Sequence, residues 1–447
     1  MEVAAEMEGA VVRPAASLRG RCTVPGDKSI SHRALILASQ AEGESRITGL
    51  LRGEDVRSTW RVLQQLGVTT GEWGDDPLTV VGKGPAGWEE PGDVLDFGNS
   101  GTGIRLMAGV LAGHPFFSVL TGDRYLRRRP MLRVAAPLRL MGAAIAGRQE
   151  GNLPPLGVTG GSLQGITYTT PVASAQVKSA LILAGLLAAG ETEVTEPALS
   201  RDHTERMLTY LGVELERSGT TVRLRGGQSW AGRDLPVPAD PSSAAFLLAA
   251  ALIVPGSEVT VPNVCCNPTR TGFIDIATAM GADLTLSGKR EAGGEPIADI
   301  TARTSSLRGI DVAPDLVPSA IDEFPLLAVL ALFAEGETVF SGAGELRVKE
   351  SDRLSTMATE LQRLGGRVRE KPDGLIIQGG RPLAGASCRS HGDHRVAMAL
   401  AVAGSALPRG TVIEDTACVG TSFPGFWDLL NSLGGDAATS LDGESSS

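Results

Sequence analysis

The chain has 447 residues and a formal net charge of −10 at pH 7. That charge argues against a nucleic-acid-binding protein, which needs a basic face. The longest apolar runs, such as 181–189, are too short to span a bilayer, and residues 1–20 contain no apolar core of signal-peptide length. The five cysteines lack metal-ligand spacing. We therefore expect a cytoplasmic protein with no metal and no membrane association.

The first informative stretch reads Gly-Asp-Lys-Ser-Ile-Ser-His-Arg at 26–33 and leads into an apolar run at 34–38. Ser29 and Ser31 are good helix N-caps, and a helix that is apolar on all sides is buried. Its N-terminus favours an anion, and Lys28 and Arg33 add positive charge. Taken alone, the stretch is equally compatible with a capped core helix and two solvated cations.

The same design returns along the chain and indicates a repeat. Its anchors, spaced about 70 residues apart, are Ser31, Thr102, Ser174, Ser242, Asp322 and Asp393. Amphipathic segments that stop at a glycine are expected between them, at 55–66, 131–141, 201–211, 269–280, 351–364 and 422–433. The sequence thus predicts six units, each with one buried helix, one surface helix and short strands.

Six units divide naturally into two domains of three. We place domain 1 at residues 1–22 and 239–447 and domain 2 at residues 23–238. One strand is expected within residues 1–21, outside the first unit. The acidic, serine-rich stretch 436–447 is expected to be a disordered tail.

Cations gather at the expected helix starts and in adjacent loops. They are Lys28, Arg33, Arg129, Lys178, Arg201, Lys349, Arg353 and Arg395. In an acidic protein, this pattern predicts a small polyanionic ligand held by charge-assisted hydrogen bonds. Asp322 and Glu350 lie among these cations and are candidates for proton transfer. Each motif alone also has an ordinary interpretation: a solvated arginine loop at 124–129, a salt-bridged surface helix at 347–353 and a capping histidine at 394.

Five stretches together resemble the 5-enolpyruvylshikimate-3-phosphate (EPSP) synthases. They are residues 26–33, Asn-Ser-Gly-Thr-Gly-Ile-Arg at 99–105, Arg-Arg-Pro at 128–130, Arg-Val-Lys-Glu-Ser-Asp-Arg-Leu at 347–354 and Asp-His-Arg at 393–395. The resemblance runs from about Val24 to Leu430. It implies an α/β fold of the inside-out barrel type, with two domains, three repeated units in each, and buried helices whose N-termini face an interdomain cleft.

The resemblance also implies an activity. A member of this family is a transferase that moves the enolpyruvyl group of phosphoenolpyruvate to the 5-hydroxyl of shikimate 3-phosphate and releases phosphate. The reaction proceeds by addition and elimination through a tetrahedral intermediate, on the shikimate pathway to chorismate and the aromatic amino acids. The implied partners are these two substrates and the inhibitor glyphosate, with no organic cofactor, no metal and no nucleic acid. A cytoplasmic monomer is expected.

By match to the motifs, the resemblance assigns residues to each substrate. Shikimate 3-phosphate is implied to contact Lys28, Ser29, Arg33, Ser174, Ala175, Gln176, Arg201, Asp322 and Lys349. Phosphoenolpyruvate is implied to contact Lys28, Gly101, Arg129, Gln176, Arg353 and Arg395. Asp322 is the candidate base near the 5-hydroxyl, Glu350 the candidate for proton exchange at the methylene carbon, and Lys28 the group that stabilises departing phosphate. The roles of Asp322 and Glu350 could be exchanged.

Two positions depart from the better-known branch of the family: Thr421 replaces a phosphate-contacting lysine, and Leu106 replaces a proline. One alternative is a UDP-N-acetylglucosamine enolpyruvyl transferase, but that family usually carries a cysteine in the loop that corresponds to 121–130, which has none here. Another is a non-catalytic phosphometabolite-binding protein, which would not need Asp322 and Glu350 among the cations.

Overall fold

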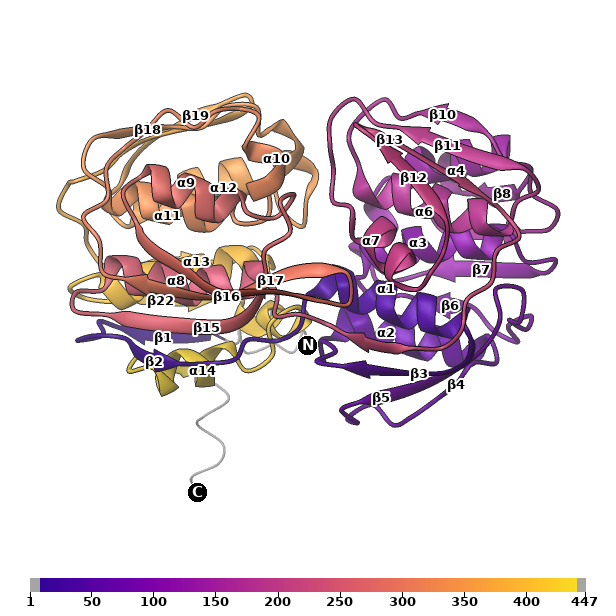
Figure 1. Cartoon of the computed structure of the whole chain (residues 1–447). Helices are drawn as coiled ribbons and strands as arrows, with labels where there is room; N and C mark the ends of the chain where they lie inside the picture. The colour runs from indigo at the N-terminus through magenta and orange to yellow at the C-terminus, as the bar shows by residue number, and fades with distance from the viewer. Residues whose placement is uncertain (1–8, 440–447) are drawn as a thin grey trace, which may run out of the picture. The chain divides into compact units, whose positions relative to one another are not determined.

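The computed structural model describes residues 9–439 and shows a mixed α/β fold (Figure 1). Contacts between Cα atoms divide the chain into two compact units. Unit 1 comprises the residues up to Pro25, Ala239–Arg290 and the residues from Pro296, and unit 2 comprises Gly26–Pro238 and Glu291–Glu295. The chain therefore passes from one unit to the other at 25–26, 238–239, 290–291 and 295–296.

Unit 2 has a core of buried helices, because these segments are apolar on nearly every face. They are α1 (Lys28–Ser39), α3 (Gly101–Ala112) and α6 (Ala175–Leu187), and α3 contacts both of the others. Helices that bury one face follow them: α2 (Glu54–Gln65), α4 (Leu132–Leu140) and α7 (His203–Tyr210). The short α5 (Arg148–Gly151) and the 3₁₀ helix η1 (Leu126–Arg128) complete the described helices of this unit.

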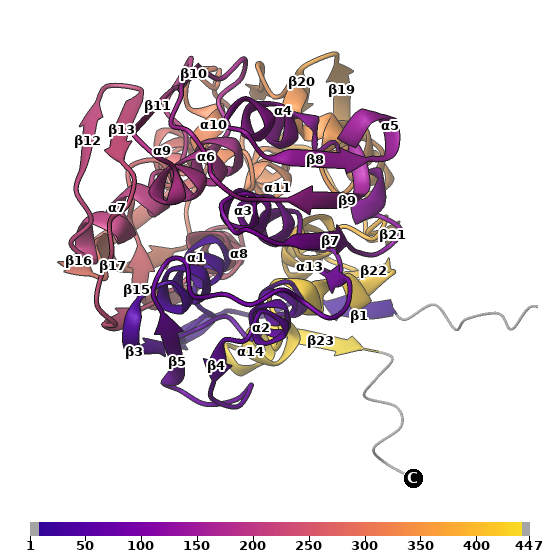
Figure 2. The same ribbon diagram turned by 90° about the vertical axis from the view of Figure 1, so that its right-hand side faces the viewer.

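The described strands of unit 2 form three sheets. Their orders are β14 (Asp234–Pro236), β3 (Glu42–Thr48), β5 (Leu78–Lys83), β4 (Thr69–Thr70); β6 (Leu95–Asp96), β7 (Phe117–Thr121), β9 (Leu153–Thr159), β8 (Ala144–Gly147); and β10 (Thr167–Thr169), β11 (Glu191–Thr195), β13 (Thr221–Arg225), β12 (Leu215–Ser218). In each sheet the first pair is parallel and the next two pairs are antiparallel. Figure 2 shows the strands that it labels in these three sheets on the outside of α1, α3 and α6.

Unit 1 is built in the same way. Its buried helices are α8 (Pro241–Ile253), α11 (Phe324–Phe333) and α13 (His394–Ala406), and each contacts the other two. Its partly buried helices are α9 (Gly272–Ala279), α12 (Arg353–Arg363) and α14 (Phe426–Ser432), with the short helices α10 (Val317–Ala320), η2 (Gly344–Val348) and η3 (Thr416–Thr421).

Three sheets also cover the described part of unit 1. Their orders are β16 (Asp283–Ala292), β17 (Glu295–Arg303), β15 (Glu258–Cys265), β2 (Arg19–Arg21); β18 (Glu337–Val339), β20 (Gly374–Gln378), β19 (Arg367–Lys371); and β21 (Ser387–Arg389), β22 (Thr411–Glu414), β1 (Gly9–Arg13), β23 (Asp436–Thr439). The tip of the β16–β17 hairpin, Glu291–Glu295, is counted with unit 2.

The start of α1 corrects the predicted capping. Ser29 and Ser31 lie inside the first turns, because the helix begins at Lys28. Asp27 is the N-cap, and its Oδ1 accepts a hydrogen bond from the Ile30 backbone N–H at 2.8 Å. The Ser31 hydroxyl instead accepts from the backbone N–H of Leu51 at 3.0 Å. The carboxylate of Asp27, two residues before Ser29, thus satisfies one of the N–H groups that the first turn leaves without a partner in the helix.

Both ends of the described chain differ from the prediction. Residues 9–21 contain two strands, β1 and β2, rather than one. Asp436–Thr439 forms β23, which pairs with β1, so the predicted disorder of 436–447 is wrong for these four residues. The remainder of that predicted tail, 440–447, lies outside the described residues.

Candidate active site

Arg353, the first residue of α12, lies at the centre of a cluster of charged residues in unit 1. Its side chain is 1% exposed, its Nε donates to Asp393 Oδ2 at 2.8 Å, and its Nη2 donates to Glu350 Oε2 at 2.8 Å. Its buried Nη1 has no hydrogen-bond partner within residues 9–439, and Asp322 Oδ1 is 3.7 Å away. Burial opposes the charge, but Asp393 and the other carboxylates outweigh it and raise the pKa of Arg353.

Asp393 fixes the orientation of Arg353. It is the N-cap of α13, where its Oδ1 accepts from the Arg395 backbone N–H at 3.0 Å, and its Oδ2 accepts from the Ser351 hydroxyl at 3.1 Å. Burial raises the pKa of Asp393, but Arg353 outweighs burial and leaves the pKa below its ordinary value. A carboxylate held in its charged form in this way suits the support of a cation rather than proton transfer.

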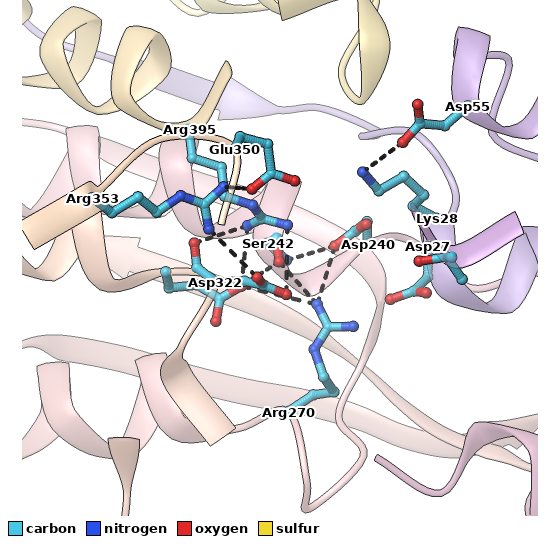
Figure 3. A network of polar contacts seen from close by, with 12 residues as sticks. Asp27, Lys28, Asp55, Asp240, Ser242, Arg270, Asp322, Glu350, Arg353 and Arg395 are labelled. Carbon is cyan, nitrogen blue, oxygen red and sulfur yellow. Dashed lines mark hydrogen bonds and ion pairs between the residues drawn. The ribbon is translucent and has the colours of Figure 1, made fainter. Parts of the chain in front are cut away.

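The side chains of Arg353 and Arg395 both lie beside the carboxylate of Asp322. It lies between α10 and α11 and is 3.7 Å from Arg353 Nη1 and 3.7 Å from Arg395 Nη2. Arg395 Nη1 also donates to the Asp322 backbone carbonyl at 2.9 Å. Figure 3 shows the guanidinium groups of Arg353 and Arg395 turned toward Asp322 from α12 and α13. Two guanidinium groups beside one partly exposed carboxylate can bind an anion and leave the carboxylate able to accept a proton.

Arg270 belongs to the same cluster and was missed by the sequence analysis. Its side chain is 2% exposed, and its Nη2 donates to Ser242 Oγ at 2.9 Å and lies 3.5 Å from Asp240 Oδ1 (Figure 3). The Ser242 hydroxyl in turn donates to Glu323 Oε1. Arg270 lies in the loop that precedes α9, and no motif in that loop indicates a site. The only signal in the sequence is that this loop occupies the same place in its unit as the loop that holds Arg201.

Lys28 is the first residue of α1 in unit 2, where it pairs with a second residue that the sequence analysis missed. Its Nζ lies 3.1 Å from Oδ2 of Asp55, which belongs to α2 (Figure 3). Both side chains are largely but not completely buried. Ser29 follows and is half-buried. A cation at a helix N-terminus with its own counter-ion can bind an anion or stabilise a departing one.

Arg33 differs from a surface anion-binding arginine. It is 3% exposed, and it donates from Nε to Thr204 Oγ1 at 2.7 Å, from Nη2 to Ser179 Oγ at 2.7 Å and from Nη1 to the Ser29 carbonyl at 2.9 Å. Burial lowers the pKa of Arg33 to about 10. These hydrogen bonds join α1 to α6 and α7, so they are internal to the fold.

The N-termini of α3 and α6 bring three predicted residues together. Gly101 opens α3, and the Arg129 side chain lies so close that a Cβ at Gly101 would be 3.1 Å from Arg129 Nη1. Gln176, on the first turn of α6, donates from Nε2 to Thr102 Oγ1 at 2.9 Å, and its Oε1 accepts from Arg105 Nη1 at 2.8 Å. The two helix starts are therefore tied to each other by side-chain hydrogen bonds.

The remaining predicted residues differ in their burial and in their partners. Ser174 is the N-cap of α6, and Ala175, Arg201 and Lys349 are half-buried beside helix starts. Lys178 instead has a buried side chain that pairs with Glu196 and Glu205 at 2.8 Å each. The prediction that Lys178 contributes charge for an external anion is therefore not supported by its position.

The described residues include no group of three or more His, Cys, Asp or Glu side chains arranged to hold a metal ion. None of the helices within 9–439 is both long and apolar enough to cross a membrane.

Fold and site together define an α/β protein with arginines, lysines and carboxylates gathered at the N-termini of buried helices, as in enzymes that act on small anions. The family model for EPSP synthase (3-phosphoshikimate 1-carboxyvinyltransferase) matches residues 12–430. The chain belongs to the EPSP synthase family and is a transferase.

Individual relatives agree with this assignment. The 3-phosphoshikimate 1-carboxyvinyltransferase of Geobacter metallireducens is 53% identical over 427 residues, which cover 96% of this chain and 99% of the relative. That of Desulforudis audaxviator is 54% identical over 422 residues, 94% of this chain and 98% of the relative. A solved EPSP synthase from Acinetobacter baumannii superposes with a TM-score of 0.89 at 46% identity and covers 97% of this chain and 100% of that one. The UDP-N-acetylglucosamine alternative is not favoured.

Proposed function

We propose that the chain transfers the enolpyruvyl group of phosphoenolpyruvate to the 5-hydroxyl of shikimate 3-phosphate and releases phosphate, in the pathway to chorismate. The observation that carries this proposal is the environment of Arg353. A fully buried guanidinium keeps Nη1 without a hydrogen-bond partner among the described residues, beside Asp322, and Arg395 lies next to the same carboxylate. Guanidinium groups in this arrangement suit the carboxylate and phosphate of the donor.

The substrate contacts are assigned by motif. For shikimate 3-phosphate they are Lys28, Ser29, Arg33, Ser174, Ala175, Gln176, Arg201, Asp322 and Lys349, and for phosphoenolpyruvate Lys28, Gly101, Arg129, Gln176, Arg353 and Arg395. Support comes from the grouping of Gly101, Arg129 and Gln176 in unit 2 and of Asp322, Arg353 and Arg395 in unit 1. Arg33 also donates to the Ser29 carbonyl at 2.9 Å, which helps to position the chain beside Lys28.

The chemistry follows from the two substrates. In the addition, the 5-hydroxyl oxygen bonds to C2 of phosphoenolpyruvate, the hydroxyl proton leaves and the methylene carbon gains a proton. In the elimination, the bond from C2 to the phosphate oxygen breaks and the methyl group returns a proton. We assign Asp322 as the base for the hydroxyl, Glu350 to proton exchange at the carbon, and Lys28 to the departing phosphate. Glu350 is 25% exposed, and its Oε2 accepts a hydrogen bond from Arg353 Nη2 at 2.8 Å, which places this carboxylate beside the proposed donor-binding guanidinium.

The finer architecture is also a proposal. We infer an inside-out α/β barrel of six repeated units, with domain 1 at 1–22 and 239–447 and domain 2 at 23–238. It is supported by the three sheets in each unit and by the parallel-then-antiparallel order that recurs in the sheets of unit 2. The five cysteines are all free thiols, which supports a cytoplasmic location. We retain the monomeric state as a prediction from the resemblance alone.

The decisive experiment is phosphate release from phosphoenolpyruvate by the purified chain. We expect release with shikimate 3-phosphate as acceptor and none with UDP-N-acetylglucosamine. Release with the second acceptor alone would establish the other enolpyruvyl transferase activity. Binding of shikimate 3-phosphate without release of phosphate, under conditions in which a related EPSP synthase is active, would leave the non-catalytic binding protein as the correct assignment.

A further inference from the structure

Glu196 is a buried carboxylate of unit 2 to which the proposed chemistry assigns no role. It directly follows β11, and its side chain is 1% exposed. Its Oε1 accepts from the Ser174 backbone N–H at 2.9 Å, and its Oε2 accepts from the Ser200 hydroxyl at 2.8 Å. Lys178 Nζ lies 2.8 Å from the same Oε2. The Glu196 side chain therefore contacts one backbone N–H and two side chains, from two separate segments of the sequence.

Two of these contacts adjoin proposed substrate-binding residues. Ser174 is the N-cap of α6 and stands beside Ala175 and Gln176 at the start of that helix. Ser200 directly precedes Arg201, in the loop that leads into α7. The carboxylate of Glu196 thus joins the segment that begins α6 to the segment that leads into α7. Ser174 in the first segment and Arg201, which follows Ser200 in the second, are both proposed contacts of shikimate 3-phosphate.

Lys178 holds this carboxylate in place. It projects from α6, and it pairs with Glu205 at 2.8 Å as well as with Glu196. Burial on its own would lower the pKa of Lys178, but Glu205 and Glu196 outweigh it and raise the pKa. Lys178 is therefore charged at neutral pH. Because the three side chains are between 1% and 3% exposed, water does not compete for these contacts.

We infer that Glu196 is a positioning residue for shikimate 3-phosphate, which sets the spacing between Ser174 and Arg201. The inference rests on the proposed function. Glu196 is almost inaccessible, so it acts through the two segments and not by touching the substrate. Its loss should therefore weaken binding of shikimate 3-phosphate, whereas the affinity for phosphoenolpyruvate and the turnover at saturation should change much less.

The test compares Glu196→Gln and Glu196→Ala with the matched control Glu193→Gln. Glu193 lies on β11, three residues earlier, and its more exposed carboxylate pairs with Arg223 instead. Kinetic constants are measured for each substrate with the other at saturation, and binding of shikimate 3-phosphate alone is measured by titration calorimetry. We expect the KM and Kd for shikimate 3-phosphate to rise by about tenfold or more in Glu196→Ala, in line with the loss of buried hydrogen bonds. Glu196→Gln keeps an acceptor for the Ser174 N–H and should show a smaller rise.

In the same Glu196 variants, the KM for phosphoenolpyruvate and kcat should change by less than about threefold, and Glu193→Gln should match the wild type. A folded Glu196→Ala enzyme with an unaltered Kd for shikimate 3-phosphate overturns the inference. So does a parallel change of both KM values and kcat, which would indicate a purely structural role. If Glu196→Ala does not fold, Ser200→Ala removes one of the contacts alone and should still raise the KM for shikimate 3-phosphate. A wild-type chain without transferase activity would refute the proposed function instead.

Discussion

Arg353 and Asp393 form an ion pair in which both side chains are excluded from solvent, at 1% and 0% exposure, with 2.8 Å between Nε and Oδ2. A buried pair of this kind has a large desolvation cost, and it is stable only when further hydrogen bonds satisfy both groups. Asp393 meets that condition through Ser351 and the backbone N–H of Arg395. Arg353 meets it only in part, since Nη1 is left to face Asp322.

Removing the charge of Asp393 should destabilise the protein. Asp393→Asn retains an N-cap residue for α13 but leaves Arg353 with Glu350 at 2.8 Å and Asp322 at 3.7 Å as counter-ions, both of which are partly exposed. We expect a loss of about 3 kcal/mol in the free energy of unfolding at pH 7, measured by urea denaturation. The control is Asp436→Asn, whose partner Arg13 is exposed and whose loss should cost less than about 1 kcal/mol. Equal losses in the two variants would contradict the prediction.

The difference in the free energy of unfolding between the wild type and Asp393→Asn should depend on pH. Because the folded-state pKa of Asp393 lies below its ordinary value, the carboxylate contributes stability above the unfolded-state pKa of about 3.9. That contribution is lost as the pH falls below this value and through the folded-state pKa. Urea denaturation should therefore give the same difference at pH 7 and pH 5 and a smaller one below pH 4. A difference that grows on acidification would show that the folded-state pKa of Asp393 is not lowered.

Asp322→Asn tests the proposed base. Asparagine occupies the same volume between Arg353 and Arg395 but cannot accept the proton of the 5-hydroxyl. We expect kcat to fall by about 10²-fold or more, with the dissociation constant of shikimate 3-phosphate nearly unchanged. Asp315→Asn, at an exposed residue of the preceding loop, is the control and should keep full activity. Near-normal turnover in Asp322→Asn would transfer the role of base to another group.

Gly101→Ala tests the prediction of glyphosate sensitivity. A Cβ at this position would lie 3.0 Å from Arg105 Nη1 and 3.1 Å from Arg129 Nη1, so both guanidinium groups must shift slightly. Because glyphosate is somewhat longer than phosphoenolpyruvate, crowding should affect the inhibitor more. We expect a sensitive wild type, and in Gly101→Ala an inhibition constant raised by about tenfold or more with a much smaller change in the KM for phosphoenolpyruvate.

The control for this prediction is Gly92→Ala, where an added Cβ meets nothing within 4 Å. It should leave both constants unchanged. A wild-type enzyme that is already indifferent to millimolar glyphosate would refute the prediction, and Leu106 and Thr421 would then be the first positions to examine. Equal changes in both constants for Gly101→Ala would show that the glycine serves the turn rather than selectivity.

Arg270→Met tests the residue that the sequence analysis missed. It would remove the guanidinium that lies 3.5 Å from the buried Asp240 and 3.9 Å from the buried Glu323, and would leave Glu323 with Arg395 Nη1 at 3.7 Å. We expect a destabilisation of about 3–5 kcal/mol, the usual cost of removing one partner from a buried charge cluster. Arg303→Met breaks an exposed pair with Glu258 and should cost less than about 1 kcal/mol. Similar thermal midpoints for the two variants would argue against a charged, structural role for Arg270.

Local sequence determined where the helices lie and where they stop, but not the residue that caps the start of α1. α8 and α11 are apolar on every face, so no arrangement other than burial satisfies them, and their positions were predictable. The glycines after the amphipathic segments were equally informative, because the conformation that ends a helix favours glycine: Gly67 has φ 79° and Gly212 has φ 87°. The motifs around Lys28 and Arg353 likewise indicated the family before any fold was known.

Tertiary structure alone decided how the charged side chains are used. Lys178 and Arg33 carry the same sequence signal as Lys28, a cation at the start of an apolar helix, yet both are buried and bonded to partners from other elements. No motif in the sequence includes Glu196 or Arg270, and only the repeat relates Arg270 to Arg201. Whether a charge faces a substrate or an internal counter-ion depends on residues brought together from distant parts of the chain, and the periodicity of a single segment contains no information about them.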